Sequence, residues 1–153
     1  MISQNITKLI GEAMKAHDGV RLSTLRMLSS EFNYEKIKLQ RDLTEEDEQN
    51  VLRKEARKRK DAIEAYKLLN AKNPNAKLKQ EQEEKELNIL QEFLPAELTE
   101  EELNQLISDS VNQIGAKTMA DMGRVIADVK SKAPSADGSV IAKIVRQKLD
   151  SSV

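Results

Sequence analysis

The stretch from Glu86 to Ile107 constrains the fold most, because it ends one helix and begins another. Three leucines at three- and four-residue spacing mark the first helix, namely Leu87, Leu90 and Leu94. Pro95 follows, and proline both lacks a backbone N–H and disfavours helical geometry in the residue before it. Further on, Thr99-x-x-Glu102 has the form of a capping box, the usual start of a new helix. The stretch therefore predicts a joint between two helical halves.

The same helical period continues through the rest of the chain and predicts an all-α fold. Aromatic residues make up 3% of the sequence and Trp is absent, which disfavours a sheet core. We expect a first domain at residues 1–94 with about four helices, and a second at residues 95–153 with three. The expected helices run from 2 to 17, from 21 to 40, from 44 to 69, from 76 or 77 to the joint at Pro95, from 99 to 114, from 118 to 132, and from 137 onward.

Two local features carry further expectations. Gly123 falls inside the sixth expected helix, where glycine costs about 1 kcal/mol relative to alanine. This cost indicates either a close approach of another helix at Gly123 or a glycine that is simply tolerated. Residues 72–75 are expected to form a polar loop, and the last helix should bury either Val140 or Ile141.

The sequence lacks the usual marks of catalysis. There is no cysteine, so no thiolate nucleophile or cysteine zinc site is available, and no glycine-rich phosphate loop occurs. The single histidine, His17, closes the first expected helix, where a cation suits the helix dipole. The acidic runs 45–48 and 100–102 fall in first turns, where carboxylates stabilise a helix. We therefore expect no catalytic residue, metal, cofactor or small-molecule substrate.

No run approaches the roughly 18 apolar residues of a membrane span, and the N-terminus lacks a signal peptide's apolar region. We therefore expect a cytoplasmic protein with no membrane partner.

Two clusters of basic residues are the candidate binding surfaces, although the formal net charge is only −1. The predicted nucleic-acid-binding residues are Arg53, Arg57 and Lys60 on the third helix, Lys143, Arg146 and Lys148 on the seventh, and Lys130 and Lys132 across the Pro134 turn. Basic stripes of this kind bind phosphates and release counterions. The alternative is a solvated helix face laced with ion pairs four residues apart. Few aromatic residues accompany the cations, so sequence-specific recognition of single strands is not expected.

Several segments resemble those of the YqeY family in both order and spacing, over nearly the whole chain. They are RLSTLRML (21–28), RKRKDAIEAY (57–66), EKELNILQEFLPAELTEEEL (84–103), GAKTMADMGRVI (115–126) and ADGSVIAKIV (136–145). The half that begins at Pro95 also resembles the C-terminal tail domain of GatB, a subunit of the glutamine-dependent tRNA amidotransferase.

This resemblance implies a helical N-terminal half joined to a small three-helix domain. In GatB the tail domain is implicated in holding tRNA, whereas amidation takes place in other domains that have no counterpart here. The RNA-facing positions implied are those around Ala136-Asp137-Gly138, together with Lys143 and Arg146. Where relatives often carry Gly and a basic residue before Ala-Asp-Gly, this chain has Pro134 and Ser135. One positive charge is therefore missing from the implied surface.

The first functional hypothesis is a non-catalytic accessory module that binds tRNA, or a tRNA-handling complex, through its second domain. The alternative is a helical protein–protein interaction module whose third and fourth helices dock a partner. Only the family label relates the chain to glutamine-dependent carbon–nitrogen ligases, and no catalytic constellation supports an independent enzyme.

Overall fold

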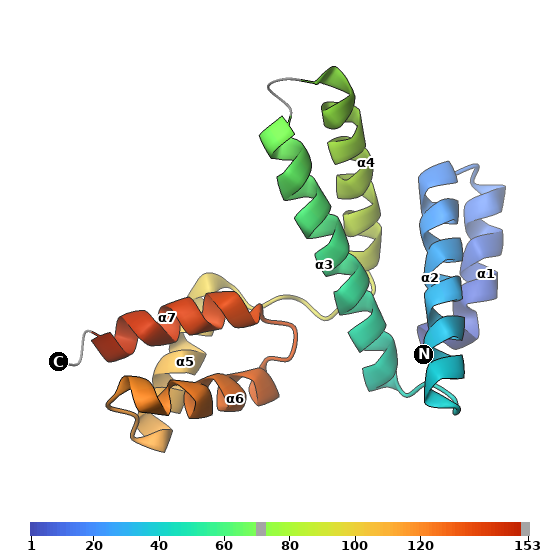
Figure 1. The fold of residues 1–153 in the computed structure, drawn as a ribbon. Helices are drawn as coiled ribbons and strands as arrows, with labels where there is room; N and C mark the ends of the chain where they lie inside the picture. The colour runs from blue at the N-terminus through green and yellow to red at the C-terminus, as the bar shows by residue number, and fades with distance from the viewer. Residues whose placement is uncertain (70–72, 151–153) are drawn as a thin grey trace. The chain divides into compact units, whose positions relative to one another are not determined.

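The computed structural model of the chain describes residues 1–69 and 73–150, and every regular element within these ranges is helical, as predicted (Figure 1). The chain separates into two compact units, Met1–Pro95 (unit 1) and Ala96–Val153 (unit 2). None of the helices in the described ranges combines the length and apolarity needed to cross a membrane.

Unit 1 contains two helical hairpins. Helices α1 (Ile2–Lys15) and α2 (Gly19–Leu39) form the first, and α3 (Glu45–Leu69) and α4 (Pro74–Gln91) form the second (Figure 1). Helix α2 packs against both α3 and α4 and so joins the two hairpins. The hydrophobic core of the unit lies where these helices meet. Its buried members are Ile6, Ala13, Leu25, Leu28, Phe32, Leu43, Val51, Leu52 and Leu90.

Several helix limits in unit 1 differ from the prediction, for local reasons. Helix α1 ends at Lys15 because His17 adopts a left-handed conformation (φ 54°), and the Asp18 carboxylate then caps α2 by accepting a hydrogen bond from the Arg21 N–H at 2.9 Å. The predicted loop 72–75 is wrong at its far end, because α4 begins at Pro74. Asn73 caps this helix, and proline is well suited to a first helical position, where its missing N–H is not needed. Lys72 lies outside the described residues.

Helix α4 also ends earlier than predicted, at Gln91 and not at the joint. Glu92, Phe93 and Leu94 form turns before Pro95. Phe93 and Leu94 still pack against the core of unit 1, so the turn replaces a last helical turn without losing apolar contact.

Unit 2 is a three-helix arrangement of α5 (Glu100–Ile114), α6 (Met122–Lys132) and α7 (Gly138–Asp150). A single 3₁₀ turn, η1 (Met119–Asp121), precedes α6. Each of the three α-helices packs against the other two. Its core consists of Leu103, Ile107, Ala116, Val125, Val129, Ile141, Ile144, Val145 and Leu149. Of the two alternatives for α7, Ile141 is buried and Val140 is 43% exposed.

The predicted capping box of α5 is confirmed. The Thr99 hydroxyl accepts a hydrogen bond from the Glu102 N–H at 3.2 Å, and the Glu102 carboxylate accepts one from the Thr99 N–H at 2.8 Å. The helix stops at Gly115, which adopts the left-handed conformation (φ 70°) that glycine tolerates best.

The expectation of a close helix approach at Gly123 is wrong. A Cβ built on Gly123 would meet nothing within 4 Å. The 3₁₀ turn moves the start of α6 to Met122, so Gly123 is the second residue of the helix and not a mid-helix residue. Of the two expectations, the tolerated glycine is the one that fits.

Candidate functional site

The solvent side of α7 carries two predicted cations that are not engaged elsewhere. Lys143 and Arg146 lie three residues apart, so about one helical turn separates them and they share a side of the helix. Both are exposed, and neither has a hydrogen-bond or ion-pair partner within residues 1–69 and 73–150. Lys148 is half-buried, two positions beyond Arg146, and has a polar interaction of its own. The structure therefore brings together two of the three predicted α7 cations.

Lys130 spans from α6 to the start of α7. Its Nζ donates a hydrogen bond to the Ala136 carbonyl oxygen at 3.0 Å. Its stem lies against Gly138, where a Cβ would come within 3.3 Å of Lys130 Cε. The Ala136-Asp137-Gly138 segment is thus held by a lysine that the sequence had assigned to nucleic-acid binding.

Lys132 points towards α5 and not towards α7. Its Nζ donates to Asp128 Oδ2 at 2.8 Å and to Gln113 Oε1 at 3.1 Å. The buried Ser110 hydroxyl donates to the same Asp128 oxygen at 2.6 Å. The hydrogen bond from Lys132, and to a smaller extent the one from Ser110, holds the pKa of the Asp128 carboxyl below its usual range. Residues two positions apart on a helix point to nearly opposite sides, which explains why Lys130 and Lys132 separate.

In unit 1, the α3 cations face different surroundings. Arg53 is half-buried and donates to Asn50 Oδ1 at 2.8 Å, whereas Arg57 and Lys60 are exposed. Lys60 has a polar interaction of its own. Their spacing places all three on one side of α3.

Arg59 was not predicted as a site residue, yet its side chain is only 14% exposed. It donates to Glu55 Oε2 at 2.7 Å within α3 and to Glu86 Oε2 at 3.3 Å on α4. Burial raises the pKa of nearby Glu83, and the charge of Glu86 adds to that rise. The sequence showed a charge run here, but only the packing of α4 decides which of its members turns inward.

A second group that was not predicted is Glu48 of α3, which is 1% exposed and whose carboxylate lies against the first residues of α1. It accepts hydrogen bonds from the Ile2 N–H at 2.8 Å, from the Ser3 N–H at 3.1 Å and from the Ser3 hydroxyl. The cap of α1 therefore comes from α3. No side chain within α1 provides one.

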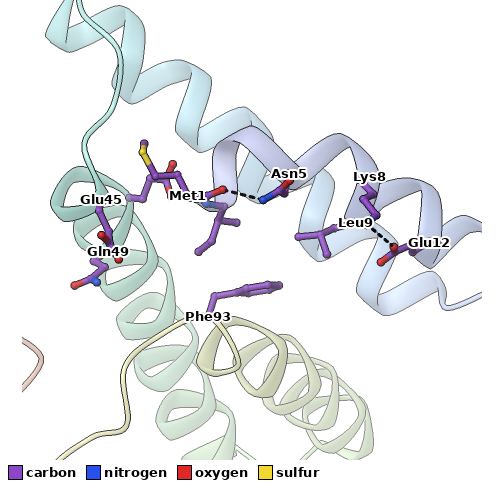
Figure 2. Close-up of a pocket in the computed structure, with 10 residues that line it drawn as sticks. Met1, Asn5, Lys8, Leu9, Glu12, Glu45, Gln49 and Phe93 are labelled. Atoms are coloured by element: carbon purple, nitrogen blue, oxygen red, sulfur yellow. Dashed lines mark hydrogen bonds and ion pairs between the residues drawn. The ribbon is translucent and has the colours of Figure 1, made fainter.

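A hollow of about 530 Å³ opens beside this cap, between the starts of α1 and α3. Figure 2 shows the Phe93 ring in the hollow, with Glu45 and Gln49 on the α3 side and Leu9 on the α1 side. Its lining consists of Met1, Ile2, Asn5, Lys8, Leu9, Glu12, Glu45, Glu48, Gln49 and Phe93. Glu48 is already committed to the α1 amides and Glu12 lies 4.0 Å from Lys8, so two of the three carboxylates are internally paired.

Metal-ligating side chains do not gather in threes anywhere in the described part of the chain. Sequence reasoning missed Glu48, Glu55 and Arg59. Their only signal was that each lies three or four residues from a buried apolar position of α3 (Val51, Leu52, Ala56 or Ile63).

The sequence matches a known protein family. The sequence from residue 3 to residue 149 matches the family model described as Yqey-like protein, which covers nearly the whole chain. No curated protein matches the sequence.

Proposed function

The chain belongs to the YqeY-like protein family, and from this premise we propose that it is a non-catalytic module that binds tRNA, or a tRNA-handling complex, through unit 2. The observation that carries the proposal is the pair Lys143 and Arg146, both exposed and unengaged within the described residues. Two adjacent cations on one helix face suit contact with phosphate oxygens. The resemblance of this half to the GatB tail domain supports the same conclusion. Such a module would act in the cytoplasm.

Local charge favours α7 over the rest of unit 2. The unit carries 7 basic and 9 acidic residues, a net charge of −2, whereas α7 carries Lys143, Arg146 and Lys148 against Asp150 alone. An anionic ligand is therefore directed to α7 and away from the acidic first turn of α5.

The test is the electrophoretic mobility of labelled tRNA at low salt, where phosphate contacts are strongest. Wild-type protein should retard the tRNA, and the double variant Lys143→Glu, Arg146→Glu should not. The matched control, Lys117→Glu with Arg124→Glu, changes the charge of unit 2 by the same amount and should keep most of the binding. Unchanged mobility with wild-type protein at low salt would remove the proposal.

A protein-interaction module remains the second candidate because of the α3–α4 hairpin. Leu68 is 84% exposed, Leu69 is 53% exposed, and Leu78 on α4 is 66% exposed. In a capture experiment from cell extract, a protein retained by wild type and by the α7 double variant, but lost from Leu68→Ser with Leu78→Ser, would support this second function.

A further inference from the structure

Aromatic residues are confined to one unit. The chain has two Phe and two Tyr, at positions 32, 34, 66 and 93, and all four belong to unit 1. Proteins that bind single strands place aromatic rings under successive bases. Unit 2 therefore has cations for phosphates but no aromatic platform for unstacked bases.

The side of α7, and not its N-terminal end, is open to an anion. Asp137 Oδ1 accepts hydrogen bonds from the Ser139 N–H at 2.8 Å and from the Ser139 hydroxyl at 2.7 Å, so a carboxylate already occupies the start of the helix. Lys143 and Arg146 lie farther along, about 4.5 Å apart along the helix axis. Ile141, Ile144, Val145 and Leu149 bury the opposite side in the core, which fixes the orientation of the cationic side.

Lys130 links α6 to the start of α7. The hydrogen bond from its Nζ to the Ala136 oxygen and its contact with Gly138 join α6 to the first residues of α7. One of its N–H donors is therefore used in fixing the helix that presents Lys143 and Arg146. Lys132 is likewise committed, to Asp128 and Gln113.

Resting on the proposed function, we propose that unit 2 recognises double-helical RNA through its phosphate backbone, by Lys143 and Arg146 alone, with Lys130 as a positioning residue. Paired bases are stacked inside a duplex, so the missing aromatic platform costs nothing there. Recognition of this kind depends on backbone shape and charge and carries little information about sequence.

The test is the salt dependence of binding to a blunt RNA hairpin, compared with an unstructured single strand of equal length. Each phosphate contact on a double helix contributes about −0.9 to the slope of log K against log salt concentration, taking the B-DNA coefficient, so wild type should give about −1.8. Lys143→Met and Arg146→Met should each bring the slope to about −0.9. The matched controls Lys117→Met and Arg124→Met should leave it unchanged.

Lys130→Met separates a positioning role from a phosphate contact. It should weaken hairpin binding between about twofold and tenfold, the equivalent of one lost hydrogen bond, with the wild-type slope retained. Lys130→Arg, which keeps a donor, should restore part of the affinity. Thermal unfolding of both Lys130 variants checks that unit 2 is still folded. Lys143 and Arg146 are exposed, so Lys143→Met and Arg146→Met test the phosphate contacts without disturbing the core.

Two results overturn the inference alone, namely equal affinity for the single strand and the hairpin, and a slope reduced by about one unit in Lys130→Met. A slope unchanged by Lys143→Met and Arg146→Met overturns the inference and also the assignment of tRNA binding to this pair. Failure of wild type to bind either hairpin or tRNA at low salt overturns the proposed function as well.

Discussion

The two units differ in the polar groups that they bury beside their apolar cores. Unit 1 buries two carboxylates, Glu48 at 1% and Glu55 at 2% exposure. Glu48 accepts hydrogen bonds from the first amides of α1, and Glu55 accepts one from Arg59 in the next turn of α3. Unit 2, over its described residues 96–150, buries one hydroxyl, that of Ser110, and keeps its carboxylates at the surface. Both cores are apolar, and unit 1 differs in that it also buries two carboxylates that are held by hydrogen bonds and ion pairs.

This difference changes what a substitution should do. A buried charge that loses its partner costs more than the pair contributed, because its desolvation is no longer compensated. A surface cap typically contributes about 1 kcal/mol, and its loss leaves nothing buried and unpaired. The predictions below test this contrast, beginning with the largest expected effect.

Arg59→Met should destabilise unit 1 by about 3–5 kcal/mol, because it leaves the buried Glu55 with the half-exposed Lys58 as its remaining ion-pair partner among the described residues. Chemical denaturation followed by circular dichroism measures the loss. The neighbouring Lys58→Met is the control, since the Lys58 side chain is 51% exposed although it also contacts Glu55, at 2.5 Å. Arg59→Met combined with Glu55→Met should recover much of the loss. Equal effects of the two single variants would contradict a role for burial.

Glu48→Ala should destabilise unit 1 by about 1–3 kcal/mol, the cost of leaving buried donors unsatisfied. The amides of Ile2 and Ser3 lose their acceptor, so hydrogen exchange should accelerate in α1 more than in α4. Glu46→Ala removes an exposed acid of the same helical turn and serves as the control. If both variants unfolded at the same denaturant concentration, the cap on α1 would have no energetic weight.

Two glycines of unit 2 should respond with opposite signs. Gly123→Ala should stabilise the unit by about 0.4–1 kcal/mol, since a helical site with open space around it gains from alanine. Gly115→Ala should destabilise it by about 1 kcal/mol, because φ at this position is 70°. Thermal unfolding of the two variants measures both effects. A destabilising Gly123→Ala would show that another group needs this space.

The smallest expected effect is a difference in pH dependence. The raised pKa of Glu83 means that this carboxyl binds its proton more readily in folded unit 1 than in the unfolded chain, so the contribution of Glu83 to stability should rise as the pH falls through its pKa. Asp47 of the same unit contributes with the opposite sign, because hydrogen bonds from Arg41 and Thr44 lower its pKa. The lowered pKa of Asp128 gives unit 2 a contribution of the same sign as that of Asp47, since stability present above the ordinary aspartate pKa, about 3.9, is lost as the pH falls below it. Unfolding between pH 3 and pH 7 measures these contributions, and the difference between wild type and Glu83→Gln isolates that of Glu83, which the variant should abolish.

Much of the fold could be predicted because the signals that begin and end its helices are local in the sequence. The spacing of leucines, the Thr99 cap and the Gly115 stop each depend on residues within one or two helical turns. The errors also have local causes. Pro74 was interpreted as a loop residue although proline also begins helices, and Gly123 was placed mid-helix because periodicity alone does not show a 3₁₀ turn before α6.

The candidate sites were harder to predict because they depend on distant partners. Eight cations could be named from helical spacing, but whether each faces solvent or another side chain is decided elsewhere in the chain. Lys130 is bound by a carbonyl of the following loop and Lys132 by residues of α5 and α6. Glu48 and Arg59 had no signal strong enough to separate them from a solvated charge run, since their partners lie 46 and 27 residues away.

The cap that Glu48 places on α1 also fixes an order of events during synthesis. The chain is made from its N-terminus, so the first amides of α1 emerge from the ribosome well before Glu48 does. Until α3 has begun to form, the first amides of α1 lack the Glu48 acceptor, and α1 has only its packing against α2. The hydrogen bonds of α1 are therefore completed only after a segment that is translated later.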